Sequence, residues 1–100
     1  MLVSVGQARD FAPGEMHAVD VSGTTVDIAN ADGHVYAIDD TCTHMGCSLA
    51  TGELDGTTIT CPCHGSQFDV TSGRVLRGPA QEPVRSHQVE IQAGELLVEK

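Results

Sequence analysis

Two short segments of this 100-residue chain each combine cysteine with histidine. The first reads Cys-Thr-His at residues 42–44, and the second reads Cys-Pro-Cys-His at residues 61–64. Thiolate sulfur and imidazole nitrogen are ligands that bind transition metals. With one residue between Cys42 and His44, their side chains can diverge toward different metal ions, whereas a Cys-x-x-Cys motif wraps both sulfurs around one ion. The two segments therefore predict a metal centre that takes one sulfur and one nitrogen from each of two loops.

The four ligands alone leave other kinds of site open. Structural zinc sites also combine cysteine and histidine in tetrahedral sets. Their usual spacings pair Cys-x-x-Cys with His-x-x-x-His or with a second Cys-x-x-Cys, and neither pattern occurs here. A disulfide framework of all four cysteines would leave both histidines without a role. From the four ligands alone, a zinc site therefore remains an alternative.

The flanking residues complete two longer motifs. Cys42–Cys47 (Cys-Thr-His-Met-Gly-Cys) and Cys61–Phe68 (Cys-Pro-Cys-His-Gly-Ser-Gln-Phe) resemble the two cluster-binding boxes of the Rieske iron–sulfur family. The resemblance extends over about residues 33 to 98. A Rieske centre is a [2Fe-2S] cluster in which two histidines replace two cysteines on one of the irons. Two complete boxes make this resemblance far more specific than a lone Cys-x-x-His.

The resemblance implies a role for each ligand of one [2Fe-2S] cluster. Cys42 and Cys61 would bind the inner iron, and His44 and His64 would bind the outer iron. The family also covers its cluster with a Gly-Pro-rich loop, and the Gly-Pro-Ala segment around Pro79 fits this loop in position and composition. The resemblance thus implies that Pro79, like Ser66, tunes the cluster.

Cys47 and Cys63 lie inside the boxes but outside the ligand positions. In the high-potential branch of the family, cysteines at these positions form a disulfide that joins the two ligand loops. The soluble Rieske ferredoxins mostly lack this pair, so the chain combines features of both branches. A disulfide closing a loop of this length would stabilise the fold by roughly 3 kcal/mol. Two reduced, buried cysteines are the alternative.

Two further positions bear on the redox potential. In the high-potential branch, a serine at the position of Ser66 donates a hydrogen bond to a bridging sulfide. A tyrosine two positions later bonds a ligand sulfur, and this chain has Phe68 there. One of the two hydroxyl donors is therefore retained, and we expect a potential between the two branches, inside the family range of about −150 to +300 mV.

The chain is strongly acidic, with 14 acidic residues, 5 basic residues and a net charge of −9. Ten of the acidic residues lie between Asp10 and Gly73, a stretch without lysine or arginine. This charge argues against nucleic acid, whose recognition requires a basic face. It is consistent with ordinary solubilising charge, and as a whole it predicts steering toward a basic face of a redox partner.

The hydrophobic pattern predicts β-strands throughout, with one short helical turn near Ser48–Thr51. The turn signals are Asn30–Gly33, Thr71–Gly73 and Ala93–Gly94. The expected strands are Leu2–Val5, Met16–Val21, Thr24–Ala29, His34–Ile38, Thr57–Thr60, Gln67–Val70, Arg74–Leu76, Gln88–Ile91 and Leu96–Glu99.

We therefore expect an all-β fold of small antiparallel sheets, sandwich-like or barrel-like. The cluster should be held at one end by two hairpin loops and covered by the proline-rich loop. Residues 1–100 are expected to form a single Rieske domain. No signal peptide or membrane-spanning segment is predicted, so we expect a cytoplasmic protein.

The resemblance implies a one-electron carrier that is not itself an enzyme. A flavin-dependent reductase would supply its electrons, and a terminal oxygenase acting on an aromatic or related ring would receive them. His44 and His64 would form the docking tip and the electron exit of a monomeric protein. Two alternatives remain: a redox subunit of a stable complex with a higher-potential cluster, and a metal-stabilised interaction module without redox function.

Overall fold

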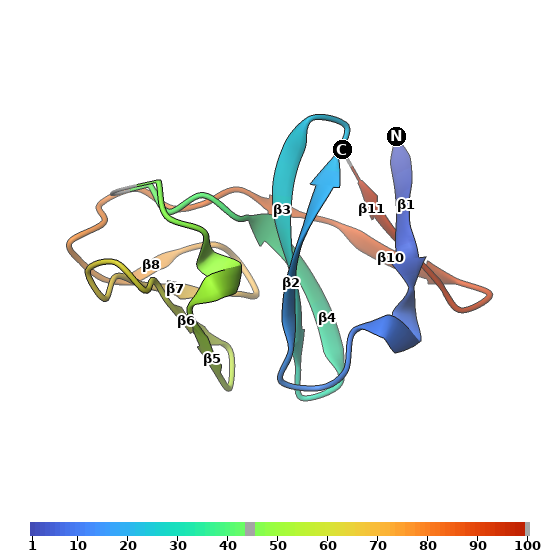
Figure 1. Cartoon of the computed structure of the whole chain (residues 1–100), viewed down its shortest axis with the longest axis horizontal. Coiled ribbons are helices and arrows are strands. Elements are labelled where there is room, and N and C mark those ends of the chain that lie inside the picture. Colours follow the sequence, from blue (N-terminus) through green and yellow to red (C-terminus); the bar gives the residue numbers. More distant parts are fainter. Residues whose placement is uncertain (44–45, 100) are drawn as a thin grey trace.

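The computed structural model describes residues 1–43 and 46–99. In this part of the chain, all regular structure consists of antiparallel strands and two single-turn 3-10 helices. The strands form three sheets arranged along the longest axis of the molecule (Figure 1). The predicted all-β class and antiparallel pairing are confirmed. No helix in the described ranges is long and apolar enough to cross a membrane.

Each sheet is named here by its place in the molecule. The base sheet has the order β1 (Leu2–Gln7), β11 (Glu95–Glu99), β10 (Val89–Gln92). The central sheet has the order β2 (Met16–Val21), β3 (Thr24–Ala31), β4 (His34–Asp39), β9 (Ser86–His87). The loop-bearing sheet has the order β5 (Glu53–Asp55), β6 (Thr58–Thr60), β7 (Gln67–Asp69), β8 (Val75–Arg77). The 3-10 helices are η1 (Ala8–Asp10) and η2 (Leu49–Thr51).

Strand β3 of the central sheet is buried on both faces from Val26 to Ala31. Side chains of successive residues on a strand point to opposite faces. On β3, Val26 and Ile28 belong to the apolar core shared with the base sheet. Ala29 and Ala31 belong to the core shared with the loop-bearing sheet. This buried part of β3 therefore packs against both neighbouring layers.

The turn between β3 and β4 shows how the sequence specifies this sheet. Asp32 and Gly33 both have positive φ, 54° and 93°. This is the backbone of a type I′ turn, whose twist matches that of the two flanking strands and which favours Asp-Gly. The predicted hairpin is confirmed, although β3 continues to Ala31, two residues further than expected.

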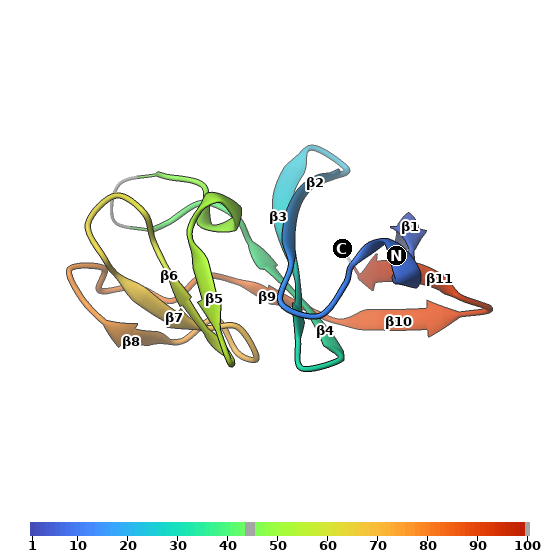
Figure 2. The same cartoon turned by 60° about the horizontal axis from the view of Figure 1, so that its bottom comes forward.

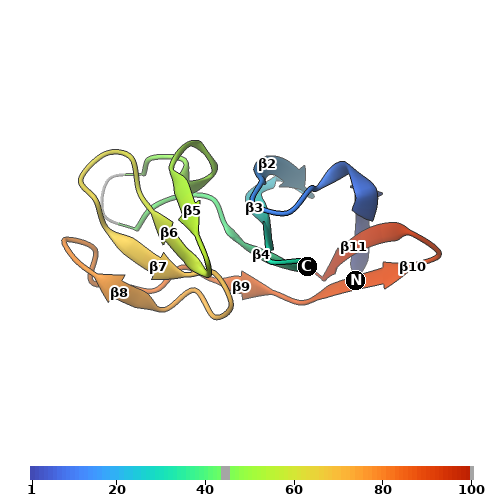
Figure 3. The ribbon, with the colours of Figure 1, turned by 90° about the horizontal axis from the view of Figure 1, so that it is seen from below.

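The loop-bearing sheet is an insertion into the central sheet. β4 and β9 are hydrogen-bonded neighbours, with Ala37 opposite His87 and Ile38 opposite Ser86. The segment between β4 and β9 forms η2 and strands β5–β8, which lie to one side of the central sheet (Figure 2, Figure 3). Both ends of the insertion are thereby held by the same sheet, and the loops that carry the cysteines project from it.

Candidate metal centre

Two loops carry the predicted ligands, and they share one hydrogen-bond pattern. In loop 1 (residues 42–47), the Cys42 N–H donates to the carbonyl of Cys47 at 2.9 Å, and the Gly46 N–H donates to the carbonyl of Cys42 at 2.8 Å. In loop 2 (residues 61–66), the Cys61 N–H donates to the carbonyl of Ser66, and the Gly65 N–H donates to that of Cys61, at 2.8 and 3.1 Å. Each leading cysteine is therefore fixed in an equivalent way.

A glycine makes each of these loops possible. Gly46 and Gly65 have φ values of 76° and 78°, a left-handed conformation that other residues adopt only with strain. Each glycine lies four residues after the leading cysteine and turns the chain back toward it. The glycines that follow the ligand pairs in the sequence are thus required by the loop geometry.

The two leading cysteines meet inside the protein. Cys42 and Cys61 are each only 2% exposed, and both are free thiols. Burial raises the pKa of the Cys61 thiol and the adjacent Cys42 thiol raises it further, whereas backbone N–H groups of Cys63 and His64 lower it. Two neighbouring buried sulfurs, one of them with N–H groups directed at it, suit a metal or cluster that binds thiolate. The chemistry of this donor set therefore fits the inner iron of a [2Fe-2S] cluster.

The other two cysteines form a disulfide between the loops. Cys47 of loop 1 is bonded to Cys63 of loop 2, with a Cα–Cα distance of 6.5 Å. Both disulfide sulfurs lie within 4.8 Å of the Cys61 sulfur. The disulfide holds the loops together on the side of the free thiols and leaves Cys42 and Cys61 as the thiols available to a metal.

Of the two predicted histidine ligands, the structure describes only His64. His64 is exposed at the tip of loop 2. His44 lies outside the described residues. Of the remaining histidines, His87 is bonded to Asp39 at 2.7 Å and His17 to Glu15 at 3.1 Å.

A third loop is attached to both ligand loops. This proline loop (residues 78–84) contains Pro79 and follows β8. The Ala80 N–H donates to the hydroxyl of Ser66 in loop 2 at 3.0 Å. The Thr43 hydroxyl of loop 1 donates to the carbonyl of Glu82 at 2.7 Å. The proline loop is therefore bonded to both loops that carry the cysteines.

Asp40, which directly follows β4, is bonded to the segment that comes after loop 1. One carboxylate oxygen of this buried residue accepts the Ala50 N–H at 2.8 Å, and the other is bonded to the Ser48 hydroxyl. The sequence indicates only a turn role for Asp40. Its link to η2 depends on Ser48 and Ala50, eight and ten residues later, which no local pattern connects to an aspartate.

A second buried carboxyl lies beside Asp40. Asp27 on β3 is fully buried, and neither carboxylate oxygen has a hydrogen-bond partner among the described residues. Burial raises the pKa of Asp27 to about 7, and the negative charge of Asp40 adds to this effect. The pairing register places exposed Asp20 on the same sheet face. Of the other elements that contact β3, η2 carries no titratable side chain, and β5 carries the exposed Glu53 and Asp55. Asp27 is therefore a neutral acid in weakly acidic solution.

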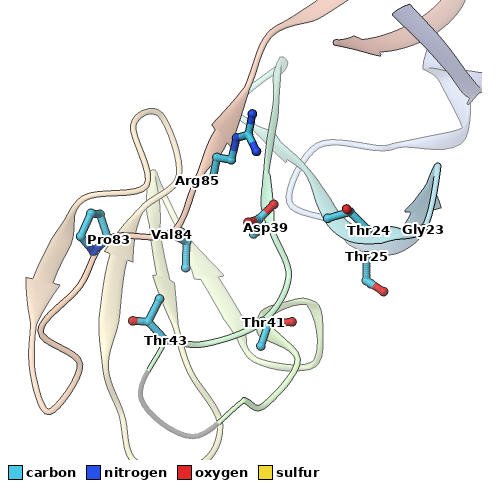
Figure 4. Close-up of a pocket in the computed structure, with 9 residues that line it drawn as sticks. All are labelled: Gly23, Thr24, Thr25, Asp39, Thr41, Thr43, Pro83, Val84 and Arg85. Atoms are coloured by element: carbon cyan, nitrogen blue, oxygen red, sulfur yellow. The ribbon is translucent and has the colours of Figure 1, made fainter. Parts of the chain in front are cut away.

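A polar groove of about 510 Å³ runs beside loop 1 (Figure 4). Its walls come from Thr41 and Thr43, from the Pro83–Arg85 segment, from Asp39 and from the Gly23–Thr25 turn. None of the cysteines lines this groove. It lies on the flank of the predicted centre and contributes no ligand.

Comparison with known proteins agrees with this geometry. The Rieske [2Fe-2S] domain family matches residues 1–88. The ferredoxin CarAc of Metapseudomonas resinovorans is 36% identical over 97 residues, which cover 96% of this chain and 91% of that protein.

Solved structures give the same assignment. The ferredoxin of carbazole 1,9a-dioxygenase from Nocardioides aromaticivorans has a TM-score of 0.94 at 33% identity, covering 98% of this chain and 96% of that one. The ferredoxin solved in complex with the oxygenase of a carbazole 1,9a-dioxygenase has a TM-score of 0.92 at 36% identity, covering 97% and 91%. The chain belongs to the Rieske [2Fe-2S] family, as an electron-carrying ferredoxin of the dioxygenase type.

Proposed function

We propose that this chain, acting as a single Rieske domain, carries single electrons from a flavin-dependent reductase to a terminal ring-hydroxylating oxygenase. The observation that carries the proposal is the pair of matched loops that bring the buried Cys42 and Cys61 thiols together. The oxygenase is proposed as a partner because a similar ferredoxin was solved in complex with its oxygenase. The reductase is proposed because other relatives are ferredoxin components of dioxygenase systems.

In this proposal, four residues hold the [2Fe-2S] cluster. Cys42 and Cys61 bind the inner iron, and His44 and His64 bind the outer iron. When bound, the cluster supplies reversible one-electron chemistry. The protein excludes water from the two thiolate sulfurs by burying them and directs two backbone N–H groups at Cys61.

The exit for electrons is assigned to the exposed tip of loop 2. His64 lies at the surface of loop 2, whereas the sulfurs of Cys42 and Cys61 lie beneath it. A partner that docks on the tip would therefore approach the histidine side of the cluster. The proline loop, bonded to Ser66 and through Glu82 to Thr43, keeps the two ligand loops in a fixed relation for that contact.

Replacing the native carrier of a carbazole 1,9a-dioxygenase tests this function. Its purified reductase and oxygenase are supplied with NADH and substrate, and this chain is added in place of their ferredoxin. We expect reduction of the cluster by the reductase and formation of hydroxylated product. Cys42→Ser, which removes one proposed ligand, is the control without a cluster. A chain with an intact cluster that exchanges electrons with neither protein would contradict the proposal.

The disulfide favours a second candidate, a redox subunit of a stable complex with a higher-potential cluster. Cys47 and Cys63 are bonded, a feature of the high-potential branch, and Ser66 is buried beneath the proline loop. A midpoint potential near the low end of the Rieske range supports the oxygenase-feeding carrier. A potential well above zero supports the second candidate.

A further inference from the structure

The charge of this protein is distributed unevenly between the segment that carries the loops and the rest of the molecule. The segment that carries the loops, residues 41–85, has four acidic and three basic residues, a net charge of −1. The remainder, residues 1–40 and 86–100, has ten acidic and two basic residues, a net charge of −8. The charged residues of the loop-bearing segment are Glu53, Asp55, Asp69, Glu82, Arg74, Arg77 and Arg85.

This distribution determines which charges interact with a partner that docks at the loops. The molecule is 40 Å long, and the loop-bearing sheet and the base sheet lie toward opposite ends of that axis (Figure 1). At physiological ionic strength, charges are screened over about 8 Å. Of the −8 outside the loop-bearing segment, residues 11–40 carry −6, and the base-sheet segments 1–10 and 88–100 carry −2. On the side of loop 1, a partner also meets Asp39, which borders the same groove as Thr43. On the side of loop 2, it interacts mainly with the charges of the loop-bearing segment, which sum to −1.

Two of the charged residues near loop 2 lie in one row across the loop-bearing sheet. One row of paired residues crosses all four strands of the loop-bearing sheet next to loop 2, and it reads Glu53, Thr60, Gln67 and Arg77. Glu53 lies on β5, one edge of the sheet, and Arg77 lies on β8, the other edge. Three strand spacings of about 4.8 Å separate their backbones by roughly 14 Å.

Both end residues of the row are available for contact. Glu53 and Arg77 are exposed, and neither side chain has a hydrogen bond or ion pair with another residue in the described ranges. Glu53 also borders a groove of about 420 Å³ together with Thr60 and with Cys61 and Gly65 of loop 2. Loop 2 is therefore flanked by one unpaired negative charge and one unpaired positive charge.

We infer that the loop-bearing end fits a protein face of mixed charge, with a basic group opposite Glu53 and an acidic group opposite Arg77. This inference rests on the proposed electron exit at the loops. The two charges fix the rotation of the carrier about its long axis, because turning it half a turn would place like charges together. A uniformly basic face would instead attract the central and base parts, which together carry −8, and hold loop 2 away from it.

Protein-film voltammetry with surfaces of known charge tests the inference without a natural partner. The iron-loaded protein is placed on gold electrodes whose alkanethiol layers end in amines, in carboxylates or in an equal mixture of both. A quartz microbalance measures how much protein binds. We expect the amine surface to bind the most protein but to exchange electrons with it at least about tenfold more slowly than the mixed surface. Fastest exchange on the amine surface would overturn the inference.

A matched pair of variants separates local from total charge. Glu53→Lys and Glu90→Lys each change the net charge from −9 to −7, and both replace an exposed strand residue. We expect Glu53→Lys to increase exchange on the carboxylate surface about tenfold and Glu90→Lys to leave it unchanged. Equal effects of the two variants would contradict the inference. If bound, iron-loaded protein gave no redox wave on any surface, the proposed electron-carrier function would fail and the docking inference with it.

Discussion

The hydroxyl of Ser66 accepts a hydrogen bond from the backbone N–H of Ala80 at 3.0 Å. Ser66 is 1% exposed and Ala80 is 4% exposed, so the bond lies inside the protein. It joins loop 2 to the proline loop. Because the serine oxygen acts as the acceptor, its own hydrogen remains free to donate to another group. Ser66 can thus hold the proline loop and bond the cluster at the same time.

Ser66→Ala separates these two roles by two measurements. The variant leaves the buried Ala80 N–H without its acceptor, so the free energy of unfolding should fall by about 1–3 kcal/mol. If the hydroxyl also bonds the cluster, this hydrogen bond stabilises the reduced cluster more than the oxidised one. We take the difference as about half of the free energy of a hydrogen bond to a charged group, roughly 1 kcal/mol. The midpoint potential should then fall by on the order of 50 mV.

Urea unfolding measures the first effect and a redox titration the second, in protein with full iron content. An unchanged midpoint together with reduced stability would show that Ser66 only holds the proline loop. The expectation of an intermediate potential would then be wrong.

Removing the disulfide should weaken the fold without removing the cluster. The double variant Cys47→Ser/Cys63→Ser opens a covalent link between residues 16 positions apart, which should lower the free energy of unfolding by about 3 kcal/mol. Cys42 and Cys61 remain as free thiols, so iron content should persist. Denaturant unfolding and iron analysis test both parts. Loss of all iron at full retention of the fold would mean that Cys47 or Cys63 is a ligand.

Gly52 marks a position where the backbone itself limits the sequence. A Cβ atom at Gly52 would overlap the carbonyl oxygen of Thr60 and lie 3.2 Å from the Pro62 ring. Gly52→Ala must therefore displace the start of loop 2, and we expect a loss of about 1–3 kcal/mol in stability and a lower iron content. Gly78→Ala is the matched control, because its nearest atom is 3.8 Å away. Equal behaviour of the two variants would contradict this account.

Asp27 should make stability depend on pH. Its pKa is about 7 in the folded protein and near 3.8 when unfolded, so the folded state holds a proton that the unfolded chain releases. The resulting stabilisation is complete below pH 4 and is lost as pH rises toward 7. Between pH 5 and 7, the free energy of unfolding should fall by about 1.4 kcal/mol per pH unit.

Asp27→Asn removes this titration and should flatten the profile, whereas Asp20→Asn, an exposed carboxyl on the same sheet face, should not. Urea unfolding at several pH values measures the slopes. If the wild-type chain and Asp27→Asn have parallel profiles, Asp27 is already ionised in the folded protein.

Much of this fold could be predicted because its strands carry local signals. β2 (Met16–Val21) has the predicted bounds, and the Asp-Gly turn before β4 lies where the sequence places it. The missed strands are β5 (Glu53–Asp55) and β9 (Ser86–His87). Each has two or three residues and depends on a partner strand far along the chain, so no periodicity marks it.

The site residues also differ in whether a local sequence signal marks them. The ligand boxes are contiguous, so the sequence shows Cys42 and Cys61 together with the glycines of their loops. Asp40 and Asp27 could not be recognised, because their importance comes from burial and from partners on other elements. The low charge of the loop-bearing segment likewise gains meaning only when the structure places this insertion on one side of the central sheet.

The central claim is that the two loops hold one [2Fe-2S] cluster. Quantitative analysis of iron, zinc and acid-labile sulfide in protein purified without oxygen or chelators tests it most directly. The account predicts two irons and two sulfides per chain, lost in Cys42→Ser and in Cys61→Ser but retained in Cys47→Ser/Cys63→Ser. One zinc per chain without labile sulfide would contradict it.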